Sequence, residues 1–260
     1  MKINMKHRIN SKFRFFYLIK LCIVFCVFFN GAPAVAQKNI VLNSTFSYPV
    51  STDSQSGFAD LVLAEAFRRI GYQLETVRVP AERALINANR GIGDGEMSRV
   101  AGLQKKYPNL IQVPESFMVI DMVLFAKNNT KLVVKGWDSV ASHSLAIISG
   151  WKIMEKNFGK LGDRVDIIKT DNAKQSFTLL KKDRVEFVAY SNWSGLGYIK
   201  NNNIKNIKLL QPPLASPKFY VYLHKRHEGI VPHLSKVIKE MKTDGTINEI
   251  FNKTLKPLLQ

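Results

Sequence analysis

Few residues in this sequence have the types and spacing that metal binding requires. His224 and His227 are separated by two residues, a lysine and an arginine, at the end of an expected strand. These positive charges disfavour a bound cation, and the spacing is not that of a helical zinc pair. Asp94 and Glu96 are a possible carboxylate pair, but we expect them to support a glycine-rich turn. The sequence therefore predicts no metal site and no cofactor.

Nucleophilic and acid–base catalysis have equally little support. Both cysteines, Cys22 and Cys26, lie within the first 36 residues. The sequence contains no Gly-x-Ser-x-Gly elbow and no phosphate-binding glycine loop. Glu82, Glu96 and Glu115 are the acids that could act in a cleft, yet none belongs to a catalytic motif. We therefore expect a protein that is not an enzyme.

The first 36 residues have the layout of a secretory signal peptide. A segment with six Lys and Arg and no acid precedes an apolar run at 21–29. Small residues at Ala34 and Ala36 form a cleavage site, which makes Gln37 the expected start of the mature chain. The uncharged stretch is shorter than the roughly 20 residues of a spanning helix. We expect a cleaved peptide and a periplasmic protein; the alternative is an uncleaved anchor.

Cleavage changes how the composition is interpreted. It removes both cysteines and six of the eighteen net positive charges, which leaves a net charge of +12. The mature chain then has no disulfide and no thiol chemistry. The remaining charge could indicate an anionic partner. However, the basic residues are scattered and are not interleaved with aromatic residues as in single-strand-binding surfaces, so we expect no nucleic-acid partner.

The hydrophobic pattern predicts two α/β halves. In the first half, strands alternate with helices, with strands at 39–44, 72–79 and 95–100 and helices at 57–70 and 81–89. The second half repeats this order, with strands at 144–148, 165–169 and 185–190 and helices at 150–158 and 172–182. Strands that alternate with helices imply parallel sheets with crossover helices.

Two further strands are expected to connect the halves. MVLFAK at 122–127 would carry the chain out of the first half, and FYVYL at 219–223 would return it. The chain would thus consist of a signal peptide at 1–36, lobe 1 at 37–127 plus 222–260, and an inserted lobe 2 at 128–221. A cleft between two lobes that are joined by two strands is a natural ligand site.

Five segments together resemble the periplasmic solute-binding proteins of the amino-acid-type ABC importers (family 3). GFADLVLAEAFRRIGY resembles the family's opening helix, and PAERALINANRGIGDGE places Asp94 at the family's aspartate. KQSFTLLKKDRVEFVAYS resembles a second-lobe helix and strand, with Glu186 where aspartate is usual. FYVYLHKRHEG and KEMKTDGTINEIFNK resemble the C-terminal signature. The resemblance covers nearly all of the mature chain.

The resemblance implies a two-lobed clamshell of the type II periplasmic-binding-protein fold. Each lobe would be a mostly parallel sheet flanked by helices, with two crossover strands between them. Such a protein, expected to be a monomer, closes on a small polar, carboxylate-bearing solute (an amino acid or a related compound) and delivers it to the membrane permease of an ABC importer. The alternatives are a dehydratase-like enzyme of the same fold and a soluble sensory module that presents its ligand to a membrane receptor.

The resemblance also implies which residues contact the solute. Arg99 is the first candidate to clamp a carboxylate with its planar guanidinium, and Arg83 is the second. A structural or exposed arginine is the alternative for each. A second-lobe helix would offer free N–H groups to the same carboxylate, and the loop after the first strand would line the cleft. The helix start is assigned to Ser149, Gly150 and Trp151. The loop is assigned to Phe46 and Tyr48.

One departure from the family affects the choice of ligand. Amino-acid binders usually hold the ammonium group with an acid just after the second-lobe strand, where this chain has Tyr190, Ser191 and Asn192. Ser191 and Asn192 can hydrogen-bond to a ligand but carry no charge. The family's Thr-Pro-x-Arg segment is also not recognisable near Arg99. Both differences weaken the case for a standard α-amino acid as the ligand.

Overall fold

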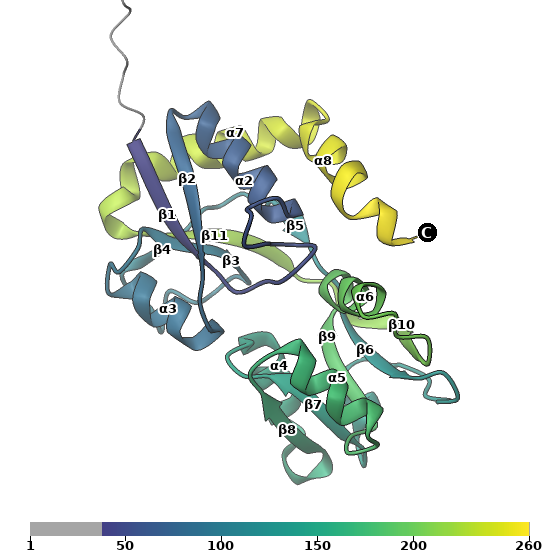
Figure 1. The fold of residues 1–260 in the computed structure, drawn as a ribbon. Helices are drawn as coiled ribbons and strands as arrows, with labels where there is room; N and C mark the ends of the chain where they lie inside the picture. The colour runs from purple at the N-terminus through teal and green to yellow at the C-terminus, as the bar shows by residue number, and fades with distance from the viewer. Residues whose placement is uncertain (1–37, 260) are drawn as a thin grey trace, which may run out of the picture. The chain divides into compact units, whose positions relative to one another are not determined.

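A computed structural model describes residues 38–259, which fold into two α/β lobes (Figure 1). The expected signal peptide, its cleavage site and Gln37 lie outside the described residues. Within 38–259, no helix has both the length and the apolar character needed to cross a membrane.

The first lobe is built on a six-stranded mixed sheet. Its strand order is β2-β1-β3-β11-β4, and β5 pairs with β11. Strand β1 is parallel to β2 and β3, whereas β11 runs antiparallel to β3, β4 and β5. The strands are β1 (Lys38–Ser44), β2 (Tyr72–Arg78), β3 (Gly95–Arg99), β4 (Leu110–Gln112), β5 (Met118–Val119) and β11 (Lys218–His224).

Four helices cover this sheet, as the apolar faces of their sequences require. Helix α2 buries Phe58, Val62, Leu63 and Phe67, which lie at helical spacing. Burying each such side chain contributes roughly 1.5–3 kcal/mol to folding. The helices are α2 (Phe58–Arg69), α3 (Ala81–Asn89), α7 (Val231–Thr243) and α8 (Thr246–Thr254).

The second lobe contains a five-stranded sheet with the order β10-β6-β9-β7-β8. Strand β7 is parallel to β8 and β9, and β6 is antiparallel to β9 and β10. The strands are β6 (Met122–Lys127), β7 (Ser144–Ile148), β8 (Asp166–Thr170), β9 (Phe187–Ser191) and β10 (Ile207–Ala215). The helices are α4 (Lys152–Gly159), α5 (Ala173–Lys181) and α6 (Asn192–Asn201).

Strand β6 pairs in the second sheet, whereas the sequence placed it in the first lobe. All residues from Met122 to Ala126 are buried, and the strand lies between β9 and β10. A run that is apolar on both faces indicates a central strand, but it does not indicate which sheet the strand joins. Strand β11 pairs in the first sheet. We therefore propose lobe boundaries near residues 121 and 217 in place of 127 and 222.

Two elements of the second lobe were not predicted. Helix α6 contains Gly195 and Gly197, which weaken a helical pattern. Both glycines allow close packing, since a Cβ on Gly197 would lie 2.7 Å from Pro49 Cδ. Strand β10 continues through Pro212 and Pro213, residues that cannot donate a backbone hydrogen bond to a sheet. Its pairing with β6 shifts register between Leu210 and Ala215, so the prolines occupy an irregular part of an edge strand.

Candidate functional site

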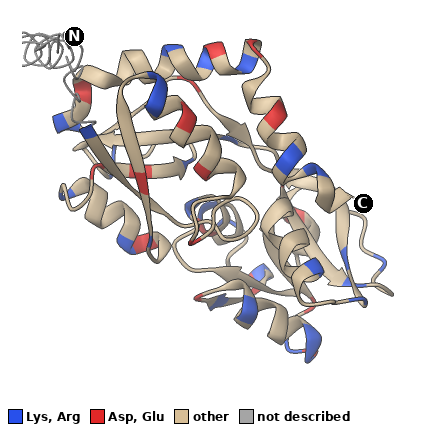
Figure 2. Ribbon diagram, turned by 45° about the horizontal axis from the view of Figure 1, so that its top comes forward, with Lys and Arg blue, Asp and Glu red and all other residues tan. Residues whose placement is uncertain are grey.

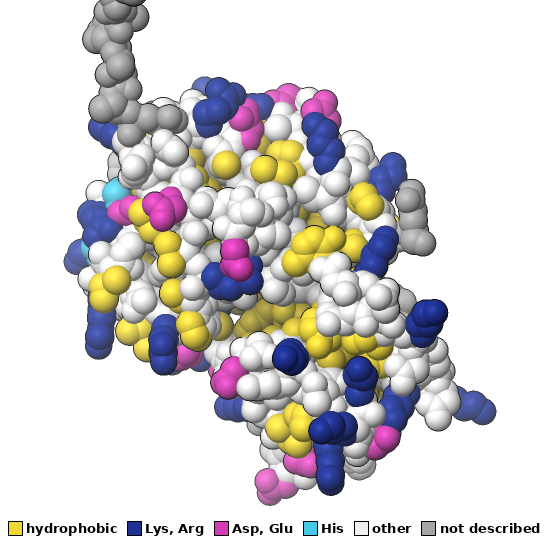
Figure 3. All heavy atoms as spheres, in the orientation of Figure 1, with side chains coloured by type: hydrophobic (Ala, Val, Ile, Leu, Met, Phe, Trp, Pro, Cys, Tyr) yellow, Lys and Arg dark blue, Asp and Glu magenta, His cyan; other side chains and the backbone are white. Residues whose placement is uncertain are grey.

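A cavity of about 660 Å³ lies between the two lobes and is lined by residues of both. We call it the large cleft cavity. Figure 3 shows a hollow between the lobes with hydrophobic side chains inside it. Strands β1, β2, β7 and β8 all end beside it, which is where ligands bind in open α/β sheets. Its lining includes Thr45, Phe46, Ser47, Arg78, Ala81, Ile148, Trp151, Asp171, Asn172, Lys174, Tyr190 and Tyr198.

A second cavity of about 30 Å³ adjoins the first. We call it the small cleft cavity. It shares Thr45, Phe46 and Trp151 with the large cavity, and Ser98, Arg99 and Lys152 also line it. The rings of Phe46 and Trp151 meet edge to face with 5.5 Å between their centroids. This aromatic contact therefore separates the two cavities.

Aromatic side chains from both lobes form a continuous wall along the cleft. Phe46 packs against Phe219 in its own lobe, and Trp151 packs against Tyr190, with centroids 5.5 and 5.0 Å apart. The Tyr190 hydroxyl lies 3.2 Å from Ser47 Oγ and so links the lobes. Phe46 and Trp151 thus line both cleft cavities, and their contact with a ligand stays a prediction. Tyr48 is 42% exposed, lies against α6 and lines neither cavity.

Arg99 lies at the small cavity but is already engaged by its own lobe. Its Nη2 donates to the Ala81 carbonyl at 2.7 Å, and its Nε lies 3.1 Å from Glu96 Oε1. Glu96 is completely buried, which raises its pKa to about 7 against the opposing effect of Arg99. The carboxylate-clamp role of Arg99 therefore stays a prediction. Arg83 is exposed on α3 and lines neither cavity.

The helix start predicted to receive a carboxylate already has an acceptor. The Gly150 N–H donates to Glu155 Oε1 at 2.9 Å, and Lys152 Nζ lies 3.0 Å from Glu155 Oε2. Lys152 also forms an ion pair with Glu82 of the other lobe. Although burial acts to raise it, the Gly150 N–H and Lys152 hold the pKa of Glu155 below its usual value. Ser149 precedes this segment and lines neither cavity.

Ser191 and Asn192 do not reach the cleft cavities. Ser191 is fully buried, and its Oγ has no hydrogen-bond partner within the described part of the chain. The Asn192 Oδ1 accepts from the Trp193 N–H at 2.8 Å, at the start of α6. Asn192 lines a different cavity of about 460 Å³, together with residues of α8. The structure therefore separates these two residues from Phe46 and Trp151.

Two cations of the large cavity were missed by the sequence reasoning. Arg78 ends β2, and its Nη2 donates to the Ser51 carbonyl at 3.1 Å and lies 3.4 Å from Asp53 Oδ1. Lys174 is in the first turn of α5, whose cap is Asn172; the Asn172 Oδ1 accepts from the Gln175 N–H. Arg78 lies at the end of a predicted strand, and Lys174 follows another. The rule that ligands bind at the carboxyl ends of strands would therefore have identified both.

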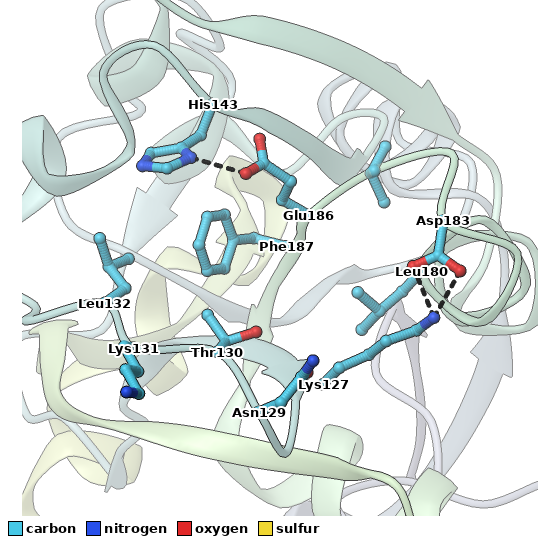
Figure 4. Close-up of a pocket in the computed structure, with 11 residues that line it drawn as sticks. Lys127, Asn129, Thr130, Lys131, Leu132, His143, Leu180, Asp183, Glu186 and Phe187 are labelled. Atoms are coloured by element: carbon cyan, nitrogen blue, oxygen red, sulfur yellow. Dashed lines mark hydrogen bonds and ion pairs between the residues drawn. The ribbon is translucent and has the colours of Figure 1, made fainter.

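A further cavity of about 480 Å³ lies at the opposite end of the second lobe (Figure 4). Its acids are paired internally. Asp183 pairs with Lys127 at 2.5 Å, and Glu186 lies 2.9 Å from His143 Nδ1. Its charges are thus largely compensated, unlike those of the large cleft cavity. Within residues 38–259, no cluster of three or more His, Cys, Asp or Glu could hold a metal ion.

No family model matches the sequence. An uncharacterised protein of Shewanella oneidensis is 26% identical over 195 residues, which are 72% of each chain. The L-cystine-binding protein TcyA of Bacillus subtilis is 23% identical over 208 residues, 78% of this chain and 73% of TcyA.

A solved structure extends the likeness to the whole fold. It is that of AbpA from Streptococcus pneumoniae, an amino acid ABC transporter substrate-binding protein bound to L-arginine. AbpA superposes with a TM-score of 0.72 at 15% identity, over 86% of this chain and 97% of AbpA. The chain therefore has the two-lobed fold of the amino-acid-type solute-binding proteins, which confirms the resemblance and the predicted fold class.

Proposed function

We propose that this chain is a periplasmic, monomeric solute-binding protein that delivers a small carboxylate-bearing solute to an ABC importer. The observation that carries the proposal is the large cleft cavity, which receives one cation from each lobe, Arg78 and Lys174. A solute that contacts both lobes stabilises the closed arrangement, because those contacts exist only when the lobes approach. Closure would then signal to the permease that the protein is loaded.

Several contacts already join the lobes around this cavity. Lys152 pairs with Glu82, Tyr190 meets Ser47, and Gly150 packs closely on Ala81. These three contacts are polar or small, and aromatic contacts of Phe46 with Trp151 and of Phe251 with Trp193 also join the lobes. A solute that bridges the lobes would add to these contacts and so favour the closed arrangement.

The likeness to TcyA and AbpA supports transport, since both are named as binding proteins, for cystine and arginine in their own cases. The expected signal peptide supports the periplasmic location. A dehydratase-like enzyme would need an acid–base pair in the cleft, and Asp171 is the one acid among the residues that line the two cleft cavities. We therefore favour binding over catalysis.

The test is to purify the protein from the periplasm of its source organism and record its native mass spectrum. We expect a bound small molecule. Adding that compound at 100 times its dissociation constant should stabilise the fold by about 2.7 kcal/mol, and X-ray scattering should show a smaller radius of gyration. A protein that changes the compound chemically, or that binds no small molecule under any condition, would refute the proposal.

A further inference from the structure

The large cleft cavity contains more positive charge than its own acids neutralise. Lys174 forms no ion pair with any residue that the structure describes, and it lies in the first turn of α5. A cation there is opposed by the positive end of the helix dipole, so its position disfavours the ligand-free state. Arg78 has an ion-pair partner only in Asp53, which is 87% exposed and 3.4 Å away. Both cations are thus available to an anion.

The acids near the cleft are not available to an ammonium group in the same way. Glu82 and Glu155 both pair with Lys152, and Glu155 also accepts from the Gly150 N–H. Glu96 is buried against Arg99. No carboxylate in this set is left without a cation, so a ligand ammonium group would have to displace a lysine or an arginine.

Asp171 is the remaining acid, and it is tied to its own helix start. Its backbone N–H donates to Gln175 Oε1 at 2.8 Å, and its carboxylate accepts from Gln175 Nε2 at 3.4 Å. It also stands three residues from Lys174, on the same rim of the cavity. One acid against two cations leaves a net positive lining, which favours an anion over a zwitterion.

The remaining lining is suited to a flat apolar group. Phe46, Trp151, Tyr190 and Tyr198 come from both lobes and line the same cavity. Aromatic faces bind planar groups by stacking and by excluding water. The cavity of about 660 Å³ is within the range of cavities that hold small organic ligands.

Taking the charge and the aromatic lining together, we propose that the cleft selects organic anions that have a planar apolar body and lack an ammonium group. This inference rests on the proposed function, since it specifies the class of solute that the same cleft would bind. Arg78 and Lys174 would hold the anionic group from opposite lobes, and the aromatic wall would hold the body. The anion would thereby remove the repulsion between two like charges that closure brings to one cavity.

The experiment uses a metabolite extract of the source organism, separated on ion exchangers into anionic, zwitterionic and cationic pools. Each pool is added to the full mature protein, and thermal stability and native mass spectra are recorded. We expect stabilisation by the anionic pool, and a bound compound with a carboxylate or similar anion, a ring and no amine. A ligand found in the zwitterionic or cationic pool, or an anion without a ring, overturns this inference but leaves solute binding intact. No stabilisation by any pool overturns the proposed function itself.

Two variants on the same helix test the role of Lys174 with the compound so isolated. Lys174→Gln should weaken its binding roughly tenfold or more, because a charge-assisted hydrogen bond is lost. Lys181→Gln, in the last turn of α5, is the matched control and should bind within about twofold of the unchanged protein. Circular dichroism and urea unfolding verify that both variants fold. Equal affinity of the Lys174 variant and the control would overturn the assignment of the anion to this cation.

Discussion

The two cavities of the cleft differ in how their charges are compensated. Beside the small cavity, Arg99 has Glu96 and the Ala81 carbonyl as partners, and Lys152 lies between two glutamates. Beside the large cavity, Arg78 has the Ser51 carbonyl and an ion-pair partner only in an exposed aspartate, and Lys174 has no ion-pair partner among residues 38–259. Compensated charges hold their own surroundings in place, whereas uncompensated charges can respond to a solute. The surroundings of the small cavity are therefore held in place by their own charge pairs, whereas the charges of the large cavity are available to a solute.

The largest expected effect concerns Glu96, in the compensated region. Its pKa is raised from 4.5 to about 7 by burial, so the folded protein binds a proton more tightly than the unfolded chain does. The contribution of Glu96 to the free energy of unfolding should therefore be highest below pH 4.5 and fall as pH rises, by about 3 kcal/mol in total once the pH exceeds 7. Glu96→Gln removes the titrating group, so this loss should be absent from the variant.

The measurement is urea unfolding of both proteins from pH 5 to pH 8. His224, whose pKa is lowered chiefly by burial, is common to both proteins, so its effect cancels in the difference. Parallel pH profiles for the two proteins would mean that Glu96 keeps an ordinary pKa. Burial would then not disfavour the charged form of Glu96 beside Arg99.

The next effect concerns the closest approach of the two lobes at Gly150. Its φ is +80°, and a Cβ there would lie 2.7 Å from the Glu82 backbone nitrogen. Gly150→Ala should cost about 1–2 kcal/mol for the left-handed backbone and should also hold the lobes apart. X-ray scattering should then show no compaction when the solute is added.

Gly159→Ala is the matched control, because this residue ends the same helix and no atom lies within 4 Å of its Cβ position. The Gly159 variant should show the same compaction by X-ray scattering as the unchanged protein when the solute is added. Normal compaction of the Gly150 variant would show that closure does not require this close contact.

The fold was largely predictable because its elements have clear hydrophobic periods. The buried face of α2 follows from the helical spacing of its apolar residues, and β2 alternates between half-buried and exposed residues as a strand with one covered face does. The sheet that receives β6 was not predictable, since MVLFAK is apolar on both faces and fits the middle of either sheet. Helix α6 was missed because its glycines serve close packing against Phe125 and Pro49, which only the folded chain brings together.

The site was predictable in its aromatic residues but not in its charges. Phe46 and Trp151 lie where a loop and a helix start suggested. What sequence position could not reveal is which charges would neutralise one another. Glu155 folds back onto the Gly150 N–H, and Glu96 meets Arg99 three residues away. These local pairings engage the Gly150 N–H and the Arg99 guanidinium, which the sequence had assigned to a ligand carboxylate.

An effect of about 1 kcal/mol is expected at the start of α5, beside the large cavity. The Asn172 side chain accepts from the Gln175 N–H at 3.1 Å and so caps the helix that contains Lys174. Asn172→Ala should lower the free energy of unfolding by about 1 kcal/mol and weaken binding of the solute, because Lys174 loses its fixed position. Asn172→Ser keeps a capping oxygen and should restore both stability and affinity. If the serine variant behaves like the alanine variant, the amide contributes something other than the cap.

The smallest effect is expected at the ion pairs of Lys152, which join α4 to α3 across the cleft. Lys152 has Glu82 and Glu155 as partners, and its side chain is 24% exposed. Partly exposed ion pairs contribute little, so Lys152→Met should cost about 0.5 kcal/mol, and this cost should shrink in 1 M salt as the pairs are screened. Lys156→Met, one turn further along α4 and exposed, is the control and should show no salt-dependent difference. Urea unfolding of both variants at low and high salt measures their costs in stability. A cost several times larger that persists in salt would mean that Lys152 is part of a rigid interlobe joint, and the lobes would then be less free to separate than the proposed binding cycle requires.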